Sequence, residues 1–275
     1  MLDRRACFIC AWRATCQKRY TVSSDMNLNV NCPDYSRDVT IRDVDVDKLM
    51  VEEQIAKWKK EKKPKYPFVI TVSRESGSGG SEISRILASE LGMDLMGGQI
   101  IQKVAESAKM STKVIESLDE KAVSALDSLV TSMFSARSIS GTEYFRHLTQ
   151  VILTIGRHGN AIIVGRGAHM ILPKDETFRL RVIAPLTLRT QRLMKSRHYT
   201  KKEAEEYIKK RDGDRVAFLK KHYQIDPADP SSYDLVINTE KIGPEGAAES
   251  AKAAYLAWVT KKGFVSPGMA RAGAH

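Results

Sequence analysis

A glycine-rich loop is the part of the sequence whose residue types point most directly to chemistry. It runs from Arg74 to Ser81 and reads Arg-Glu-Ser-Gly-Ser-Gly-Gly-Ser. Glycines let backbone N–H groups approach a phosphate closely, and a helix N-terminus behind them adds favourable electrostatics. A glycine-rich turn without a ligand is the alternative. We predict a phosphate site formed by Ser76, Gly77, Ser78, Gly79, Gly80 and Ser81.

The loop departs from the standard phosphate-binding pattern G-x-x-x-x-G-K-[ST] at two positions. Gly79 matches the last glycine and Ser81 matches the magnesium-facing hydroxyl. Arg74 stands at the first glycine, and Gly80 stands at the lysine. The positive charge that the pattern assigns to lysine must therefore come from other residues, and Arg74 is the nearest one.

Arginines further along the chain are the second requirement of such a site, because phosphoryl transfer depends on stabilising charge. Arg189 and Arg192 lie three apart, and Arg211 and Arg215 lie four apart, so each pair shares one helix face. Asp212 lies beside the second pair and is expected to orient an arginine or hold a magnesium-bound water. A solvated helix face is the alternative for any single arginine. For the four as a group we predict phosphate clamps.

All four cysteines fall within the first 32 residues. Cys7 and Cys10 have the C-x-x-C spacing of a metal knuckle, and Cys16 and Cys32 would complete four ligands. Tetrahedral zinc is the first expectation, and an iron–sulfur cluster is the alternative because a proline follows Cys32. Four free thiols are the third interpretation. Such a short segment would need a metal to stabilise it.

Composition sets limits on the partners. The 275 residues carry a formal net charge of +11, which favours an anionic partner such as nucleotide phosphates. Nucleic acid is a weaker expectation because the basic helices lack interleaved aromatics and a recognised binding module. No apolar run approaches the length that spans a bilayer, and none resembles a signal-peptide core. The sequence predicts a cytoplasmic protein.

Alternating strands and helices predict an α/β fold with a parallel sheet covered on both faces. A helix is expected over 46–63, a closing helix over 246–260, and breaks in a helical region near Ser111 and 138–141. Further helices are expected from Leu186 and from Thr200. The expected strands are 38–41, 68–72, 161–164, 178–183 and 235–238. These elements divide the chain into a cysteine-rich segment (1–47), a helix and linker (48–66), a main domain (67–262) and a tail (263–275).

Four stretches within residues 66 to 262 carry ordered motifs: 70–80, 163–168, Ala184-Pro185 with the arginines that follow, and 233–239. Together they resemble the cytidylate kinase-like family, a branch of the P-loop nucleoside-monophosphate kinases. The chain differs from the family pattern at Ser81, where an arginine is usual, and at Gly167, where an aspartate usually follows Arg166. An acidic residue usual after the first helix is replaced by Met-Gly-Gly at 96–98.

The resemblance implies a kinase fold that binds ATP and magnesium and transfers the γ-phosphoryl group to a pyrimidine monophosphate such as CMP or dCMP. It places the acceptor phosphate near Arg166. The catalytic residues that it implies are Arg74, Arg189, Arg192, Arg211, Arg215 and Asp212. The alternative is a catalytically weak nucleotide-binding regulator with a metal- or redox-sensing N-terminal segment. Loss of the loop lysine favours that alternative.

Overall fold

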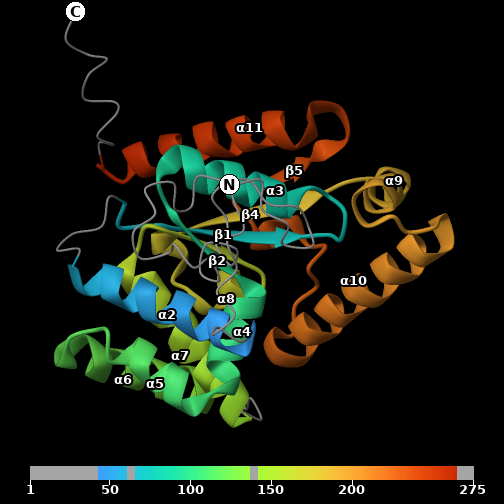
Figure 1. Ribbon diagram of the computed structural model, residues 1–275. Helices are drawn as coiled ribbons and strands as arrows, with labels where there is room; N and C mark the ends of the chain where they lie inside the picture. The colour runs from blue at the N-terminus through green and yellow to red at the C-terminus, as the bar shows by residue number, and fades with distance from the viewer. Residues whose placement is uncertain (1–42, 61–65, 137–141, 265–275) are drawn as a thin grey trace, which may run out of the picture.

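The computed structural model describes residues 43–60, 66–136 and 142–264, and a five-stranded sheet lies at their centre (Figure 1). The strands are β1 (Val69–Arg74), β2 (Asp94–Gly97), β3 (Ala161–Val164), β4 (Thr177–Ile183) and β5 (Leu235–Asn238). Their order is β2-β3-β1-β4-β5, and every neighbouring pair is parallel. The expected parallel α/β sheet is thereby confirmed.

Helices cover both faces of this sheet (Figure 1). The α-helices are α2 (Asp43–Lys60), α3 (Gly80–Leu91), α4 (Gly98–Glu106), α5 (Ala108–Ile115), α6 (Glu120–Ala136), α7 (Glu143–His158), α8 (Ala168–Ile171), α9 (Leu186–Arg197), α10 (Lys201–Tyr223) and α11 (Thr239–Lys261). Two short 3-10 helices are η1 (Lys174–Glu176) and η2 (Pro230–Ser232). Figure 1 shows α3 and α11 together on one side of the sheet, and α2 with α4 to α7 on the other.

Two hydrophobic cores follow from this layering, because successive residues of a strand point to opposite faces. In β1, Val69 belongs to the core beneath α4 to α8, whereas Ile70 belongs to the core beneath α3 and α11. The second core includes Leu87 from α3 and Tyr255 from α11, both fully buried. A strand buried on both faces needs a continuous apolar run, which explains the sequence of β1.

The centre of the sheet determines where a ligand site belongs. β1 lies between β3 and β4, so the chain leaves its carboxyl end where the strand order reverses. In open parallel sheets, ligands bind outside the carboxyl ends of the strands at this reversal point. The loop that joins β1 to α3 lies there, and α9 and α10 follow from β4 beside it (Figure 1).

Most expected elements are confirmed within one or two residues. The strands expected over 161–164 and 235–238 match β3 and β5, and those over 68–72 and 178–183 match β1 and β4. The expected N-terminal helix corresponds to α2, although it begins three residues earlier. The strand expected over 38–41 lies outside the described residues. The division into four segments stays a prediction.

Three features differ from the sequence expectation. The helix break expected near Ser111 is wrong: Ser111 is buried within α5 and its hydroxyl donates to the Val104 carbonyl. The chain breaks at Ser107 instead, whose side chain caps α5. β2 was not expected, and α11 begins seven residues before the expected 246. A kink at Gly243, with φ +65°, separates these early residues from the rest of α11.

Candidate nucleotide-binding site

The glycine loop forms a tight turn between β1 and α3. Gly77 and Gly79 have φ values of +78° and +90°, a region that favours glycine. Gly77 also meets a neighbour, because a Cβ there would lie 2.7 Å from the Arg189 carbonyl oxygen. The Ser78 hydroxyl donates to the Glu75 carbonyl at 2.9 Å and closes the turn. The loop therefore has one defined backbone shape, and it leads directly into the N-terminus of α3.

Arg74 and Gly80, the two departures from the standard pattern, lie against each other. A Cβ at Gly80 would lie 2.6 Å from the Cβ of Arg74, which leaves no room for a lysine. The Arg74 side chain also passes Gly165, where an added Cβ would overlap its Nη1 atom. The space that a larger side chain would need at position 80 is thus occupied by Arg74, from the end of β1.

The charge of Arg74 is only partly balanced within the protein, because three arginines act on it as well as Asp212. Its Nε atom is buried and has no hydrogen-bond partner among the described residues. Burial and the positive charges of Arg215, Arg166 and Arg211 together lower the pKa of Arg74 to about 9, although Asp212 opposes this shift. The guanidinium stays charged at neutral pH, because this pKa remains above 7. A buried cation among cations is unfavourable unless an anion binds beside it.

The two arginines of α9 contact the loop from outside. Arg189 donates through Nη1 to the Ser76 carbonyl at 3.2 Å and to Asp212 at 2.7 Å, and through Nε to the Ala184 carbonyl at 3.0 Å. Arg192 donates through Nη1 to the Ser78 carbonyl at 3.0 Å and to the Thr239 hydroxyl at 2.8 Å. The predicted pairing of these arginines on one helix face agrees with this arrangement. Their role as phosphate clamps stays a prediction.

Asp212 links α10 to the loop. One carboxylate oxygen accepts from the Ser76 backbone N–H at 2.9 Å and from Arg215 Nη1 at 2.9 Å, and the other accepts from Arg189. Arg215 also donates to the Arg74 carbonyl and to the Ser76 hydroxyl. The expectation that Asp212 orients an arginine agrees with these contacts. Arg211 is exposed on α10 and donates no hydrogen bond to a described residue.

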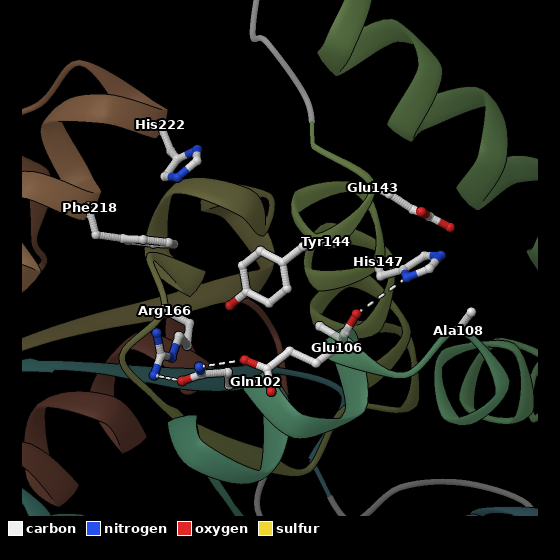
Figure 2. Close-up of a pocket in the computed structure, with 10 residues that line it drawn as sticks. Gln102, Glu106, Ala108, Glu143, Tyr144, His147, Arg166, Phe218 and His222 are labelled. Atoms are coloured by element: carbon white, nitrogen blue, oxygen red, sulfur yellow. Dashed lines mark hydrogen bonds between the residues drawn. The ribbon is translucent and has the colours of Figure 1, made fainter.

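A cavity of about 640 Å³, with Arg166 in its wall, opens near the arginines that surround the glycine loop. It lies between α4, α7 and α10, and Figure 2 shows Tyr144 projecting into its middle. Its lining residues are Gln102, Ala105, Glu106, Ala108, Glu143, Tyr144, His147, Arg166, Phe218 and His222. A cavity of this size with aromatic walls and a few polar groups suits a small organic ligand.

Arg166 joins the cavity to the loop. It lies between two glycines with positive φ, and its own φ is +57°. Its Nε donates to the Gly98 carbonyl at 3.2 Å, and its Nη2 donates to Gln102 (Figure 2). At Gly167, an added Cβ would overlap the ring of Tyr223. The aspartate of the family pattern therefore has no room at this position.

Four further residues of the site were not predicted as site residues. Glu75 accepts the Ala184 N–H at 3.2 Å and lies 3.5 Å from Arg189, and Thr239 donates to the Ser78 carbonyl at 2.8 Å. These two lie within motifs of the sequence, the glycine loop and the stretch 233–239. Gln102 and Tyr144 line the cavity from two different helices and belong to no such motif, so only their position in the cavity reveals them.

The four predicted metal ligands, Cys7, Cys10, Cys16 and Cys32, lie outside the described residues, so zinc or iron–sulfur binding stays a prediction. Among residues 43–60, 66–136 and 142–264, no group of histidine, aspartate and glutamate side chains is arranged to hold a metal ion. Within the same ranges, no helix is both long enough and apolar enough to cross a membrane.

The parallel sheet, the glycine loop at its centre and the arginine-bearing helices define a phosphotransferase of the P-loop kinase class. The model of the cytidylate kinase-like family matches residues 69–241. This chain belongs to the cytidylate kinase-like family.

Curated relatives agree with this assignment. The cytidylate kinase of Pyrococcus horikoshii is 29% identical over 192 residues, covering 70% of this chain and 90% of the relative. The cytidylate kinase of Ignicoccus hospitalis is 27% identical over 185 residues, covering 67% and 96%. Among solved structures, an uncharacterized protein from Eubacterium ventriosum has a TM-score of 0.53 and 22% identity, over 66% of this chain and 94% of that one. This last likeness concerns the fold alone.

Proposed function

We propose that this protein transfers the γ-phosphoryl group of ATP to a pyrimidine nucleoside monophosphate, CMP or dCMP. The observation that carries the proposal is Arg74, a buried cation at the start of the glycine loop whose Nε atom has no hydrogen-bond partner among the described residues. The names of the cytidylate kinase relatives support the choice of acceptor. ATP phosphates would lie on the loop, and the monophosphate would enter the cavity with its phosphate toward Arg166.

Asp212 supports the assignment of the loop to phosphate. Its carboxylate accepts hydrogen bonds from one loop N–H group and from two guanidinium groups. A phosphate group offers the same kind of acceptor oxygens, and arginine binds both anions through parallel hydrogen bonds. The contacts made by Asp212 therefore show that these donors converge on a single anionic group.

Phosphoryl transfer between the two sites needs charge stabilisation more than proton transfer. The acceptor is a phosphate that is largely ionised at neutral pH, so no general base is required. Arg74, Arg211 and Arg215 are close enough to influence one another's charge, and together they would offset the negative charge that develops on the moving group. Arg189 and Arg192 would keep the loop in shape.

A magnesium ion fits this site in a limited way. Ser81 lies in the first turn of α3, is exposed, and its hydroxyl makes no hydrogen bond with a described residue. Magnesium usually keeps several waters and binds one or two protein groups together with substrate phosphates. Ser81 would hold it, and the ion would neutralise phosphate charge when bound.

The test is an assay of ADP formation with ATP, Mg²⁺ and a panel of CMP, dCMP, UMP, AMP and GMP. We expect turnover with CMP or dCMP, and a fall of about 100-fold in kcat for Arg211→Ala, as for loss of one charge-stabilising donor. Lys209→Ala is the matched control on the same exposed helix and should retain activity. ATP binding by calorimetry without turnover on any acceptor would instead support the regulator.

A further inference from the structure

Three side chains form a hydrogen-bonded chain along one wall of the cavity. Arg166 Nη2 donates to Gln102 Oε1, and Gln102 Nε2 donates to Glu106 Oε1 at 2.6 Å (Figure 2). Gln102 and Glu106 lie four apart on α4, so both face the same side of the helix. This series of hydrogen bonds leads from Arg166, whose charge acts on Arg74, to the carboxylate of Glu106.

The chemistry of Arg166 and Glu106 determines which group donates in each of these two hydrogen bonds. A guanidinium can only donate, so the Gln102 oxygen must face Arg166. An ionised carboxylate can only accept, so the Gln102 amide nitrogen must face Glu106. The Glu106 carboxylate therefore presents only acceptor oxygens. A ligand edge that meets Glu106 must carry a hydrogen-bond donor.

Other walls of the cavity suit a flat ring next to this carboxylate. Tyr144 from α7 projects between Gln102 and Glu106 on one side and Phe218 from α10 on the other (Figure 2). If the phosphate of a nucleotide binds at Arg166, its base extends away from the cationic cluster, along the wall that holds Glu106. Aromatic side chains offer such a base contact area without selecting its identity.

We propose that Glu106 is the specificity-determining residue that selects cytosine over uracil in the acceptor site. This inference rests on the proposed function. Cytosine presents an amino group at C4, which donates to a carboxylate, whereas uracil presents a carbonyl oxygen at that position, as thymine does. The carbonyl oxygen would face the acceptor oxygens of Glu106 without a hydrogen. This carboxylate comes from α4, whereas the family pattern has its aspartate at the position of Gly167.

The experiment compares kcat/KM for CMP and for UMP in four forms of the full chain: wild type, Glu106→Gln, Glu106→Asp and Glu116→Gln. We expect the wild type to prefer CMP, and Glu106→Gln to lower the ratio of CMP to UMP by at least about tenfold. Glu106→Asp keeps the carboxylate and should retain the preference for CMP. Glu116→Gln makes the same charge change on the exposed residue that caps the C-terminus of the neighbouring helix α5, and it should leave the ratio unchanged.

Each outcome separates the inference from the proposed function. Equal losses with both acceptors in Glu106→Gln, or a wild type that prefers UMP, would overturn the role of Glu106 while leaving kinase activity in place. A wild type without turnover on any pyrimidine monophosphate would overturn the proposed function itself. Because Glu106 is exposed at the end of α4, the substitution should leave the thermal unfolding midpoint within about 2 °C of the wild type.

Discussion

Two groups of arginines surround the glycine loop, and they differ in what they contact. Arg189 and Arg192 of α9 bind loop carbonyls, and Arg189 also reaches Asp212. Arg74 has a buried Nε with no partner among the described residues, and its nearest charges include three other arginines. The first group has its hydrogen bonds within the protein. Arg74 is surrounded mainly by positive charge, with Asp212 as an opposing charge, so we propose that a bound anion completes the balance of its charge.

Substituting methionine for Arg74 tests this comparison most severely. Arg74→Met keeps most of the length of the side chain and removes the charge. We expect kcat for CMP phosphorylation to fall by about 1,000-fold, while the free energy of unfolding stays the same or rises, because removing a buried charge among other positive charges removes an unfavourable contribution to the folded state. Coupled ADP detection and urea unfolding measure the two quantities.

Lys209→Ala serves again as the control, since Lys209 is exposed and outside the site. A large loss of stability in Arg74→Met, with activity lost only in proportion to unfolding, would show that Arg74 is a structural residue. The distinction between the two groups would then fail.

The same substitution at Arg189 should give the opposite result. Arg189→Met removes the donor to Asp212 Oδ2, and it also leaves the Ser76 and Ala184 carbonyls with one donor fewer. The Arg189 side chain is only 12% exposed, so solvent replaces these bonds poorly. We expect the free energy of unfolding to fall by about 3 kcal/mol, as when one partner of a buried pair is removed. Urea unfolding of both methionine variants under one set of conditions gives a direct comparison.

Stability equal to that of Arg74→Met would contradict the bracing role. Arg189→Lys provides a further control, because an ammonium group cannot reproduce the forked contacts of the guanidinium. We expect it to recover only part of the stability that Arg189→Met loses.

The sequence predicted those elements whose own residues form a recognisable local pattern. β3 and β5 are short apolar runs bounded by turn residues, and their bounds match the expectation. β2 was missed because Asp94–Gly97 lacks a run of β-branched residues and begins with a charged residue. Asp94 is buried only because Gln54 and Lys57 of α2 bond to its carboxylate. A strand stabilised by such a distant partner carries no local pattern.

The candidate site likewise has a part that the sequence predicted and a part that it did not. The loop was predictable because its three glycines fall within four positions and the local backbone conformation favours them. The contact between Ser76 N–H and Asp212 was not, since it joins residues 136 positions apart and depends on how α10 folds back. The cavity wall formed by Gln102, Glu106 and Tyr144 has no motif either. Its meaning depends on three side chains meeting around one space.

His169 sharpens the comparison because it is buried and unpartnered but uncharged. Its Nε2 has no partner among the described residues, and its ring stacks on Tyr233 with centroids 5.1 Å apart. Burial and the charges of Arg179 and Arg181 together lower the pKa of His169 to about 4. The imidazole is therefore neutral at pH 7, and its missing hydrogen bond involves no unbalanced charge. An unpartnered group marks a ligand site only when it is also charged.

This difference predicts how stability depends on pH. Between pH 6.5 and 4 the unfolded chain binds a proton at His169 and the folded protein does not, so the free energy of unfolding falls as pH falls. His169→Gln should show a smaller fall between pH 7 and 4.5 by urea unfolding. A part should remain, because burial also lowers the pKa of His158 to about 4. An unchanged pH dependence in His169→Gln would mean that the folded protein protonates His169, and the contrast with Arg74 would no longer rest on charge.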